Sequence, residues 1–224
     1  MCILLSFIFA LMCSSVFAFE TNLLLIRHGE TDWNAETRMQ GLTDTSLNEK
    51  GVLQAKETAI KLLKNHPDIG VIYSSHLKRA YFTACETAFL FSLPVYKNFS
   101  LREFDVGEAR GKTKAEILAL YGPEDILIEK YPDKKERWNY SLVPGQEVLN
   151  DRIQRIRRVL TEISQKHPSE KIAVFTHQGS LIALIADLKD IDRLNTIYVP
   201  NCAILQVIYD SENVENPFRI VSLD

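Results

Sequence analysis

The 224-residue sequence is 46% hydrophobic and 25% charged, which fits one globular domain with a buried core and room for a cleft. Its formal net charge of -3 at pH 7 gives no field over the whole protein that would attract nucleic acid or an anionic membrane surface. Any affinity for phosphate must therefore be local.

Residues 1–18 contain no charged side chain and end in Val16-Phe17-Ala18. Val16 and Ala18 suit a signal peptidase, and the apolar stretch is shorter than the ~20 residues of a spanning helix. We therefore expect a signal peptide over 1–18, one domain over 19–224, and export to the periplasm or the medium. An uncleaved membrane anchor is the alternative, because no Lys or Arg precedes the apolar run.

Two of the four cysteines, Cys2 and Cys13, fall in this expected signal, which leaves Cys85 and Cys202 in the mature chain. Both lie in apolar surroundings, so we expect buried free thiols. A disulfide between them stays open as an alternative if the protein reaches an oxidising compartment.

From Asn22 onward, short apolar runs alternate with stretches of helical periodicity, which predicts an α/β fold with a mostly parallel sheet. Asn48 is the expected N-cap of a helix running to about residue 64, with Val52, Ala55, Ala59 and Leu62 on one face. Further helices are expected at about 77–91 and 147–165. Strands are expected at 23–26, 71–73, 171–175, 203–209 and 219–223, with an extended segment at 95–96.

Three other features have plain structural interpretations. His66 and His167 each precede a proline at the end of a helix, where a cation suits the helix dipole. Four arginines of the 147–165 helix lie off its apolar stripe and predict a solvated face. They are Arg152, Arg155, Arg157 and Arg158. Residues 108–145 are irregular and charged, and we expect a lid-like insertion over one end of the sheet.

Two expected strands end in a histidine: one runs into Arg27-His28-Gly29 and another into Thr176-His177-Gln178. Ligands bind outside the carboxyl ends of parallel strands, so the two histidines can share a site. Arg79 falls in the first turn of the helix that follows the 71–73 strand, at the same edge. Glu103 follows the extended 95–96 segment and can return to that edge.

This set of side chains suits a phosphate group. Arginine forks bind the phosphoryl oxygens, a neutral imidazole can attack phosphorus, and Glu103 is the best candidate for the acid that protonates the leaving oxygen. A metal site on His28 and His177 is the main competitor. The nearby arginines would repel a dication, and the sequence has no His-x-x-x-His or Cys-x-x-Cys pattern. The sequence also lacks the Gly-x-Ser-x-Gly motif that many serine-triad hydrolases carry at the nucleophile, which argues against that class.

The motifs resemble the histidine phosphatase superfamily, in its phosphoglycerate mutase-like branch. The similarity spans about residues 22–209 and rests on Leu25-Ile26-Arg27-His28-Gly29-Glu30-Thr31, Arg38-Met39-Gln40-Gly41, Ser74-Ser75-His76-Leu77-Lys78-Arg79-Ala80, Leu101-Arg102-Glu103-Phe104-Asp105-Val106-Gly107, Pro144-Gly145-Gln146-Glu147 and Phe175-Thr176-His177-Gln178-Gly179. It implies a three-layer fold with helices on both faces of the sheet. It also implies a pocket that needs neither metal nor cofactor.

The resemblance further assigns roles to single residues. His28 would be the nucleophile, Glu103 the proton donor, and Arg27, Arg79 and His177 would hold the phosphoryl group. Asn34, Gln40 and Gly41 would add hydrogen bonds to substrate or phosphate. Gln178 is also expected to contact the substrate, although the family usually has glycine after the second histidine. Gln146 and Val148 depart from the usual Pro-Gly-Gly-Glu-Ser.

Within this family we expect a phosphatase that acts on a small phosphorylated substrate. Residues 108–145 are shorter and of more mixed charge than the basic insertion that the cofactor-dependent mutases carry, and an exported protein would have no glycolytic step to catalyse. The acid phosphatase and phytase branch has another arginine and a proline after Arg-His-Gly, where this sequence has Glu30 and Thr31. Phosphoglycerate mutase activity is the alternative reaction, and a non-catalytic module that binds a phosphorylated ligand is the alternative class.

Overall fold

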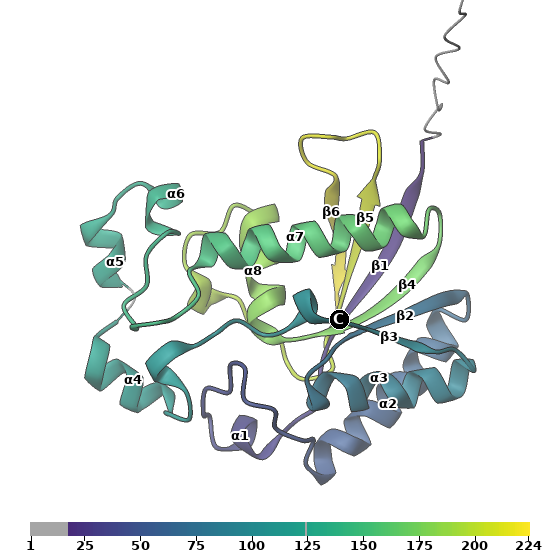
Figure 1. Cartoon of the computed structure of the whole chain (residues 1–224), viewed down its shortest axis with the longest axis horizontal. Coiled ribbons are helices and arrows are strands. Elements are labelled where there is room, and N and C mark those ends of the chain that lie inside the picture. Colours follow the sequence, from purple (N-terminus) through teal and green to yellow (C-terminus); the bar gives the residue numbers. More distant parts are fainter. Residues whose placement is uncertain (1–17, 124) are drawn as a thin grey trace, which may run out of the picture.

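The computed structural model describes residues 18–123 and 125–224, so the expected signal peptide lies outside the described residues except for Ala18. The described chain forms one six-stranded sheet in the order β3-β2-β4-β1-β5-β6 (Figure 1). The strands are β1 (Glu20–Arg27), β2 (Ile69–Ser75), β3 (Val95–Asn98), β4 (Lys171–Thr176), β5 (Ile204–Asp210) and β6 (Phe218–Leu223). Each expected strand is present, and the extended 95–96 segment is edge strand β3.

The four strands on one side of the sheet, β3, β2, β4 and β1, run parallel to one another. β5 is antiparallel to β1, and β6 is antiparallel to β5. The predicted mostly parallel sheet is therefore confirmed. The antiparallel pairing of β1 with β5 has one consequence for the site, because it brings the start of β5 to the carboxyl end of β1.

Alternating residues of β1 face two separate apolar cores, which makes three layers (Figure 1). Leu23 and Leu25 pack on the side of α7 (Leu149–Lys166) and α8 (Gln178–Leu188). Leu24 and Ile26 pack on the side of α2 (Glu49–Asn65) and α3 (Lys78–Phe91). With both faces covered, only the ends of the strands are open to a ligand.

The predicted start of α2 is confirmed, since the Asn48 side chain accepts a hydrogen bond from the Gly51 backbone N–H at 2.8 Å. One residue of its expected buried face is misplaced: Val52 is 39% exposed. Gly51 takes the inward position instead, where a Cβ atom would overlap the main chain of Glu30. His66 and His167 stand at the ends of α2 and α7, as expected.

The segment 108–145 is more regular than its sequence indicates. It contains α4 (Lys114–Tyr121), α5 (Asp125–Lys130) and α6 (Lys134–Arg137). In Figure 1, α5 and α6 lie to the left of α7, and α4 lies below them. Trp138 packs against Leu149 and Ile153 of α7. Ion pairs join this segment to the loop after α8. They are Lys134–Asp190, Arg137–Asp192 and Arg193–Asp125.

The prediction of a solvated arginine face on α7 is wrong for three of its four residues, because only Arg158 is exposed. Arg157 is half-buried and paired with Asp187 of α8. Arg152 is buried, with its guanidinium 3.8 Å from the centroid of the Phe104 ring. Arg155 is half-buried and paired with Glu147. Both side chains hold the loop that carries Glu103 against α7, so their charge serves internal packing.

Cys85 and Cys202 are free thiols, as expected, but each is half-buried rather than buried, and no disulfide joins them. Burial raises the pKa of the Cys202 thiol. Within residues 18–123 and 125–224, no helix has the length and apolar character that crossing a membrane requires.

Candidate active site

The carboxyl ends of β1 and β4 bring His28 and His177 together. Arg27 and Thr176 are register partners in the parallel pair, and the His28 backbone N–H donates to the Thr176 carbonyl at 3.1 Å. Each histidine is the next residue after its strand. Their ring centroids lie 5.2 Å apart, and both rings are almost fully buried, at 2% and 0% exposure.

Hydrogen bonding fixes the protonation of the His28 ring. Nδ1 lies 2.6 Å from the carbonyl oxygen of Gly29, and because that oxygen can only accept, Nδ1 carries the proton. Nε2 lies 3.2 Å from the Nε–H of Arg79 and accepts from it. Burial, with the positive charges of Arg79 and Arg27, holds the pKa of His28 well below 6.5. His28 is therefore neutral, with the lone pair of Nε2 directed at Arg79.

Arg79 is buried, at 1% exposure, and three hydrogen bonds hold its guanidinium. Besides its bond to His28, Nη2 donates to the Gly41 carbonyl at 2.8 Å and Nη1 donates to the Thr43 carbonyl at 2.7 Å. Burial lowers the pKa of Arg79 to about 10, so the guanidinium stays charged at neutral pH. These bonds place a fixed positive charge beside the His28 lone pair.

Buried donors around His28 lack protein partners. Among the described residues, neither ring nitrogen of His177 has a hydrogen-bond partner, and neither does Nε of Arg27. An unsatisfied buried polar group costs about 1–3 kcal/mol, so such groups point to a ligand that satisfies them. The unsatisfied atoms and the charges of Arg27 and Arg79 together suit a small anion. Burial and Arg79 lower the pKa of His177 well below 6.5, so its ring is neutral and offers one N–H.

The Glu103 carboxylate is oriented by two backbone N–H groups. Phe104 donates to Oε1 at 3.0 Å, and Gly179 donates to Oε2 at 3.1 Å. Gly179 follows His177 by two residues, so these bonds tie the carboxylate to the start of α8. A Cβ atom at position 179 would overlap Glu103 and the Phe104 ring. Only glycine lets the carboxylate approach this closely.

A family model of the histidine phosphatase superfamily (branch 1) matches residues 23–217. The chain belongs to this superfamily. It is 35% identical over 174 residues to phosphoserine phosphatase 1 of Hydrogenobacter thermophilus, covering 76% of this chain and 77% of the relative. It is 29% identical over 212 residues to a 2,3-bisphosphoglycerate-dependent phosphoglycerate mutase of Lachnoclostridium phytofermentans, covering 84% and 85%.

Solved structures agree with this assignment. A mycobacterial glucosyl-3-phosphoglycerate phosphatase in complex with VO3 superposes with a TM-score of 0.73 and 27% identity, covering 90% of this chain and 97% of that one. With phosphatases among its relatives and its structural neighbours, the chain is a phosphomonoesterase of the histidine phosphatase type.

In this histidine phosphatase, the other residues predicted to contact the substrate already form hydrogen bonds within the protein. Asn34 accepts hydrogen bonds at Oδ1 from the Thr31 hydroxyl and from Asn201, so only its NH2 group can serve a substrate. Gln40 accepts from the Thr45 hydroxyl. The carbonyl of Gly41 binds Arg79. Gln178 donates to the Val199 carbonyl at 3.4 Å, the same oxygen that Nη1 of Arg27 reaches at 2.7 Å.

Two residues that support His28 had no role assigned from the sequence. The Thr83 hydroxyl accepts from the Gly29 N–H at 3.0 Å and donates to the Arg79 carbonyl at 2.7 Å, which joins β1 to α3. Nδ2 of Asn201 donates to the His28 carbonyl at 2.9 Å. Thr83 lies one helical turn after Arg79 on α3, and this spacing could have singled it out. Asn201 carries no such signal, because its position depends on the direction of β5.

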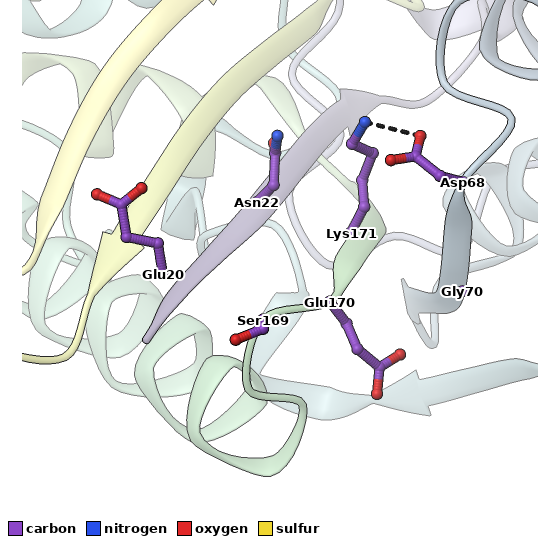
Figure 2. A pocket seen from close by; sticks show the side chains of 7 residues that line it. All are labelled: Glu20, Asn22, Asp68, Gly70, Ser169, Glu170 and Lys171. Atoms are coloured by element: carbon purple, nitrogen blue, oxygen red, sulfur yellow. Dashed lines mark hydrogen bonds and ion pairs between the residues drawn. The ribbon is translucent and has the colours of Figure 1, made fainter. Parts of the chain in front are cut away.

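Two further observations concern metal ligands and a second hollow in the described residues. Among the described residues, no group of three or more His, Cys, Asp or Glu side chains is arranged to hold a metal ion. The hollow in Figure 2 is lined by Glu20, Asn22 and Lys171, where β1 and β4 begin. It therefore lies at the opposite end of the sheet from His28, and its Lys171–Asp68 ion pair is already formed.

Proposed function

We propose that this histidine phosphatase hydrolyses small phosphate monoesters through a phosphohistidine on His28, without a metal ion. The observation that carries the proposal is the fixed tautomer of His28. Its Nδ1–H is bound to the Gly29 carbonyl, and its Nε2 lone pair faces Arg79 beside the unsatisfied donors of Arg27 and His177. A nucleophile and a cradle for phosphoryl oxygens therefore share one small space.

In the first step, a phosphoryl oxygen replaces Nε2 of His28 as the acceptor of the hydrogen bond from the Arg79 Nε–H. This frees the Nε2 lone pair of His28. Nε2 then forms a bond to phosphorus as the ester P–O bond breaks. The leaving oxygen takes a proton from Glu103 and departs as an alcohol. The charge that spreads over the equatorial oxygens is stabilised by Arg27, Arg79 and His177. The two backbone bonds to Glu103 keep its carboxyl group oriented for this transfer.

In the second step, Glu103 as a carboxylate removes a proton from water, and the water oxygen attacks phosphorus. The P–N bond breaks and inorganic phosphate leaves. His28 returns to its neutral form, and Glu103 holds its proton again. Atoms and charge balance over the two steps, and neither step requires a metal ion.

Mutase activity would require the phosphorylated intermediate to be retained rather than hydrolysed. Two basic residues of the 108–145 segment, Lys134 and Arg137, are not free for that, since they are paired with Asp190 and Asp192. This pairing favours hydrolysis over transfer.

The test is turnover of p-nitrophenyl phosphate in the presence of a chelator, with His28→Ala compared with wild type. We expect the chelator to have no effect and His28→Ala to lose at least 1000-fold in kcat, roughly the range for losing a covalent nucleophile. His66→Ala is the matched control, because it removes a histidine at the far end of α2. Protein quenched in alkaline denaturant should carry a phosphoryl group that is stable to base and labile to acid, in wild type alone. Full activity in His28→Ala would sink the proposal, and tight binding of a phosphorylated ligand without turnover would favour a binding module.

A further inference from the structure

The segment 199–202, which leads into β5, is hydrogen-bonded to the phosphate site at several points. The carbonyl of Val199 accepts from Nη1 of Arg27 at 2.7 Å. Nδ2 of Asn201 donates to the His28 carbonyl at 2.9 Å, and the Cys202 backbone N–H donates to the Arg27 carbonyl at 3.1 Å. The segment therefore lies directly beside Arg27 and His28.

Tyr198 immediately precedes this segment, and its side chain points away from the apolar core. Val199 is fully buried in the core beneath α7 and α8, and Ile197 packs against the same core. The backbone at Ile197 is extended, with φ of -93° and ψ of 116°. Because successive side chains of an extended backbone point to opposite sides, Tyr198 points outward, and it is 76% exposed.

The electrostatics of Arg27 place the Tyr198 hydroxyl near the phosphate site. Burial lowers the pKa of the Arg27 guanidinium, and the negative charges of Glu103 and of ionised Tyr198 oppose that shift. A charge interaction of this kind weakens with distance and is screened by water, so both groups must lie close to the guanidinium. Glu103 and Tyr198 therefore both stand beside Arg27, whose Nε has no partner among the described residues.

Tyr198 lies on the side of the site from which the leaving group departs. Nε2 of Gln178, the first residue of α8, donates to the Val199 carbonyl at 3.4 Å. The backbone N–H of the next residue, Gly179, donates to Oε2 of Glu103 at 3.1 Å. The start of α8 therefore contacts both the proposed acid and the loop that carries Tyr198.

We propose that Tyr198 stacks on the leaving group of the substrate, so that the enzyme prefers phosphate esters whose alcohol carries an aromatic ring. The inference rests on the proposed function, because Glu103 defines the side on which the leaving group departs. Within residues 18–123 and 125–224, the Tyr198 ring stacks on no other ring or cation, and its hydroxyl forms no hydrogen bond. Its apolar face is therefore open to a ligand, and aromatic pairs attract each other beyond the area that they bury.

The test compares two esters of primary alcohols, benzyl phosphate and ethyl phosphate, of which only the first carries a ring. Both alkoxides require a proton to depart, so both depend on Glu103 in the same way. The quantity measured is the ratio of kcat/KM for benzyl phosphate to kcat/KM for ethyl phosphate. We expect Tyr198→Ala to lower this ratio about 3- to 10-fold, the usual range for a lost aromatic pair.

Phe89→Ala is the matched control, because Phe89 is an aromatic side chain that is 81% exposed near the far end of α3 from Arg79. It should leave the ratio within about twofold of wild type. Tyr198→Phe keeps the ring and loses the hydroxyl, so it should also keep the ratio. Equal losses for both esters in Tyr198→Ala, or the same fall of the ratio in Tyr198→Ala and Phe89→Ala, overturns the inference.

Hydrolysis of ethyl phosphate, which has no ring, reports on the proposed function alone. If it proceeds while the ratio is insensitive to Tyr198→Ala, only this inference fails. If neither ester is hydrolysed, the proposed function fails, and calorimetric binding of benzylphosphonate and ethylphosphonate to wild type and Tyr198→Ala decides the inference. A preference for benzylphosphonate that is lost in Tyr198→Ala would support it, and the same preference in both proteins would overturn it.

Discussion

The Nε–H of Arg79 donates to Nε2 of His28 at 3.2 Å, which joins the fixed cation of the site directly to the proposed nucleophile. The bond can form only while Nε2 is unprotonated, and both side chains are buried. Arg79 thus keeps His28 neutral and at the same time offers the positive charge that a phosphoryl group requires. A positive charge without these fixed N–H donors could not perform both functions.

Arg79→Lys should therefore lower kcat/KM by about 100- to 1000-fold, the usual loss for removing a preorganised donor from a transition state. The ammonium of lysine cannot bond the Gly41 and Thr43 carbonyls and a phosphoryl oxygen in the same fork. Steady-state hydrolysis of p-nitrophenyl phosphate measures the effect. Lys78→Gln, on the exposed neighbour, is the control, and a loss below fivefold in Arg79→Lys would contradict this account.

Glu103→Gln should show a loss that depends on the leaving group. An alkoxide needs a proton to depart, so hydrolysis of glycerol 3-phosphate should fall by about 100- to 10,000-fold. Nitrophenolate departs without a proton, so phosphorylation of His28 by p-nitrophenyl phosphate should fall much less. Rapid quench would then show a burst of nitrophenolate, because the second step still lacks its base. Equal losses for both esters would show that Glu103 is not the acid.

Thr83→Val removes the hydroxyl that joins Gly29 to Arg79 while keeping the side-chain volume. It leaves a buried N–H and a buried carbonyl without that partner, so the free energy of unfolding should fall by about 1–3 kcal/mol. Thr83→Ser restores the hydroxyl and should recover most of the loss. Urea unfolding of the two variants gives the comparison, and an equally unstable serine variant would mean that the methyl group matters instead.

The stability of the protein should fall as the pH drops below about 6.5. Burial and Arg79 hold the pKa values of His28 and His177 well below 6.5 in the folded state. Unfolding returns the pKa of each histidine to its ordinary value. At a pH between the folded and the unfolded pKa, the unfolded chain therefore binds more protons than the folded one. In that range each histidine lowers the free energy of unfolding by up to about 1.4 kcal/mol for each unit that the pH falls. Above pH 6.5 this contribution is constant. The free energy of unfolding, measured by urea between pH 7 and 5.5, should depend less steeply on pH in His177→Asn than in wild type. The same pH dependence in both proteins would refute the lowered pKa of His177.

We propose that the chain is exported and cleaved after Ala18. The mature protein would begin at Phe19, whose backbone N–H binds the Ser211 hydroxyl at 2.9 Å and whose ring lies 6.0 Å from that of Tyr209. Mass spectrometry of protein from a secreting host should find Phe19 as the first residue. An intact Met1 in the membrane fraction would support the anchor instead.

The sequence by itself determined the strands, the long helices and the set of chemically useful side chains. Local patterns suffice for these, because alternation, helical periodicity and an N-cap such as Asn48 act over a few residues. His28, Arg79, Glu103 and His177 stand at the ends of elements that can be recognised locally. Their common edge follows from the rule for parallel strands.

The tertiary structure decided which of these groups face each other and what each can do. The tautomer of His28 depends on Gly29 and Arg79 together, and the place of Asn201 depends on β5 running antiparallel to β1. Arg152 and Arg155 look solvent-facing in the helix pattern but are covered by the loop that carries Glu103. The physical reason is the same in each case: burial, hydrogen-bond partners and pKa depend on distances between residues far apart in the chain.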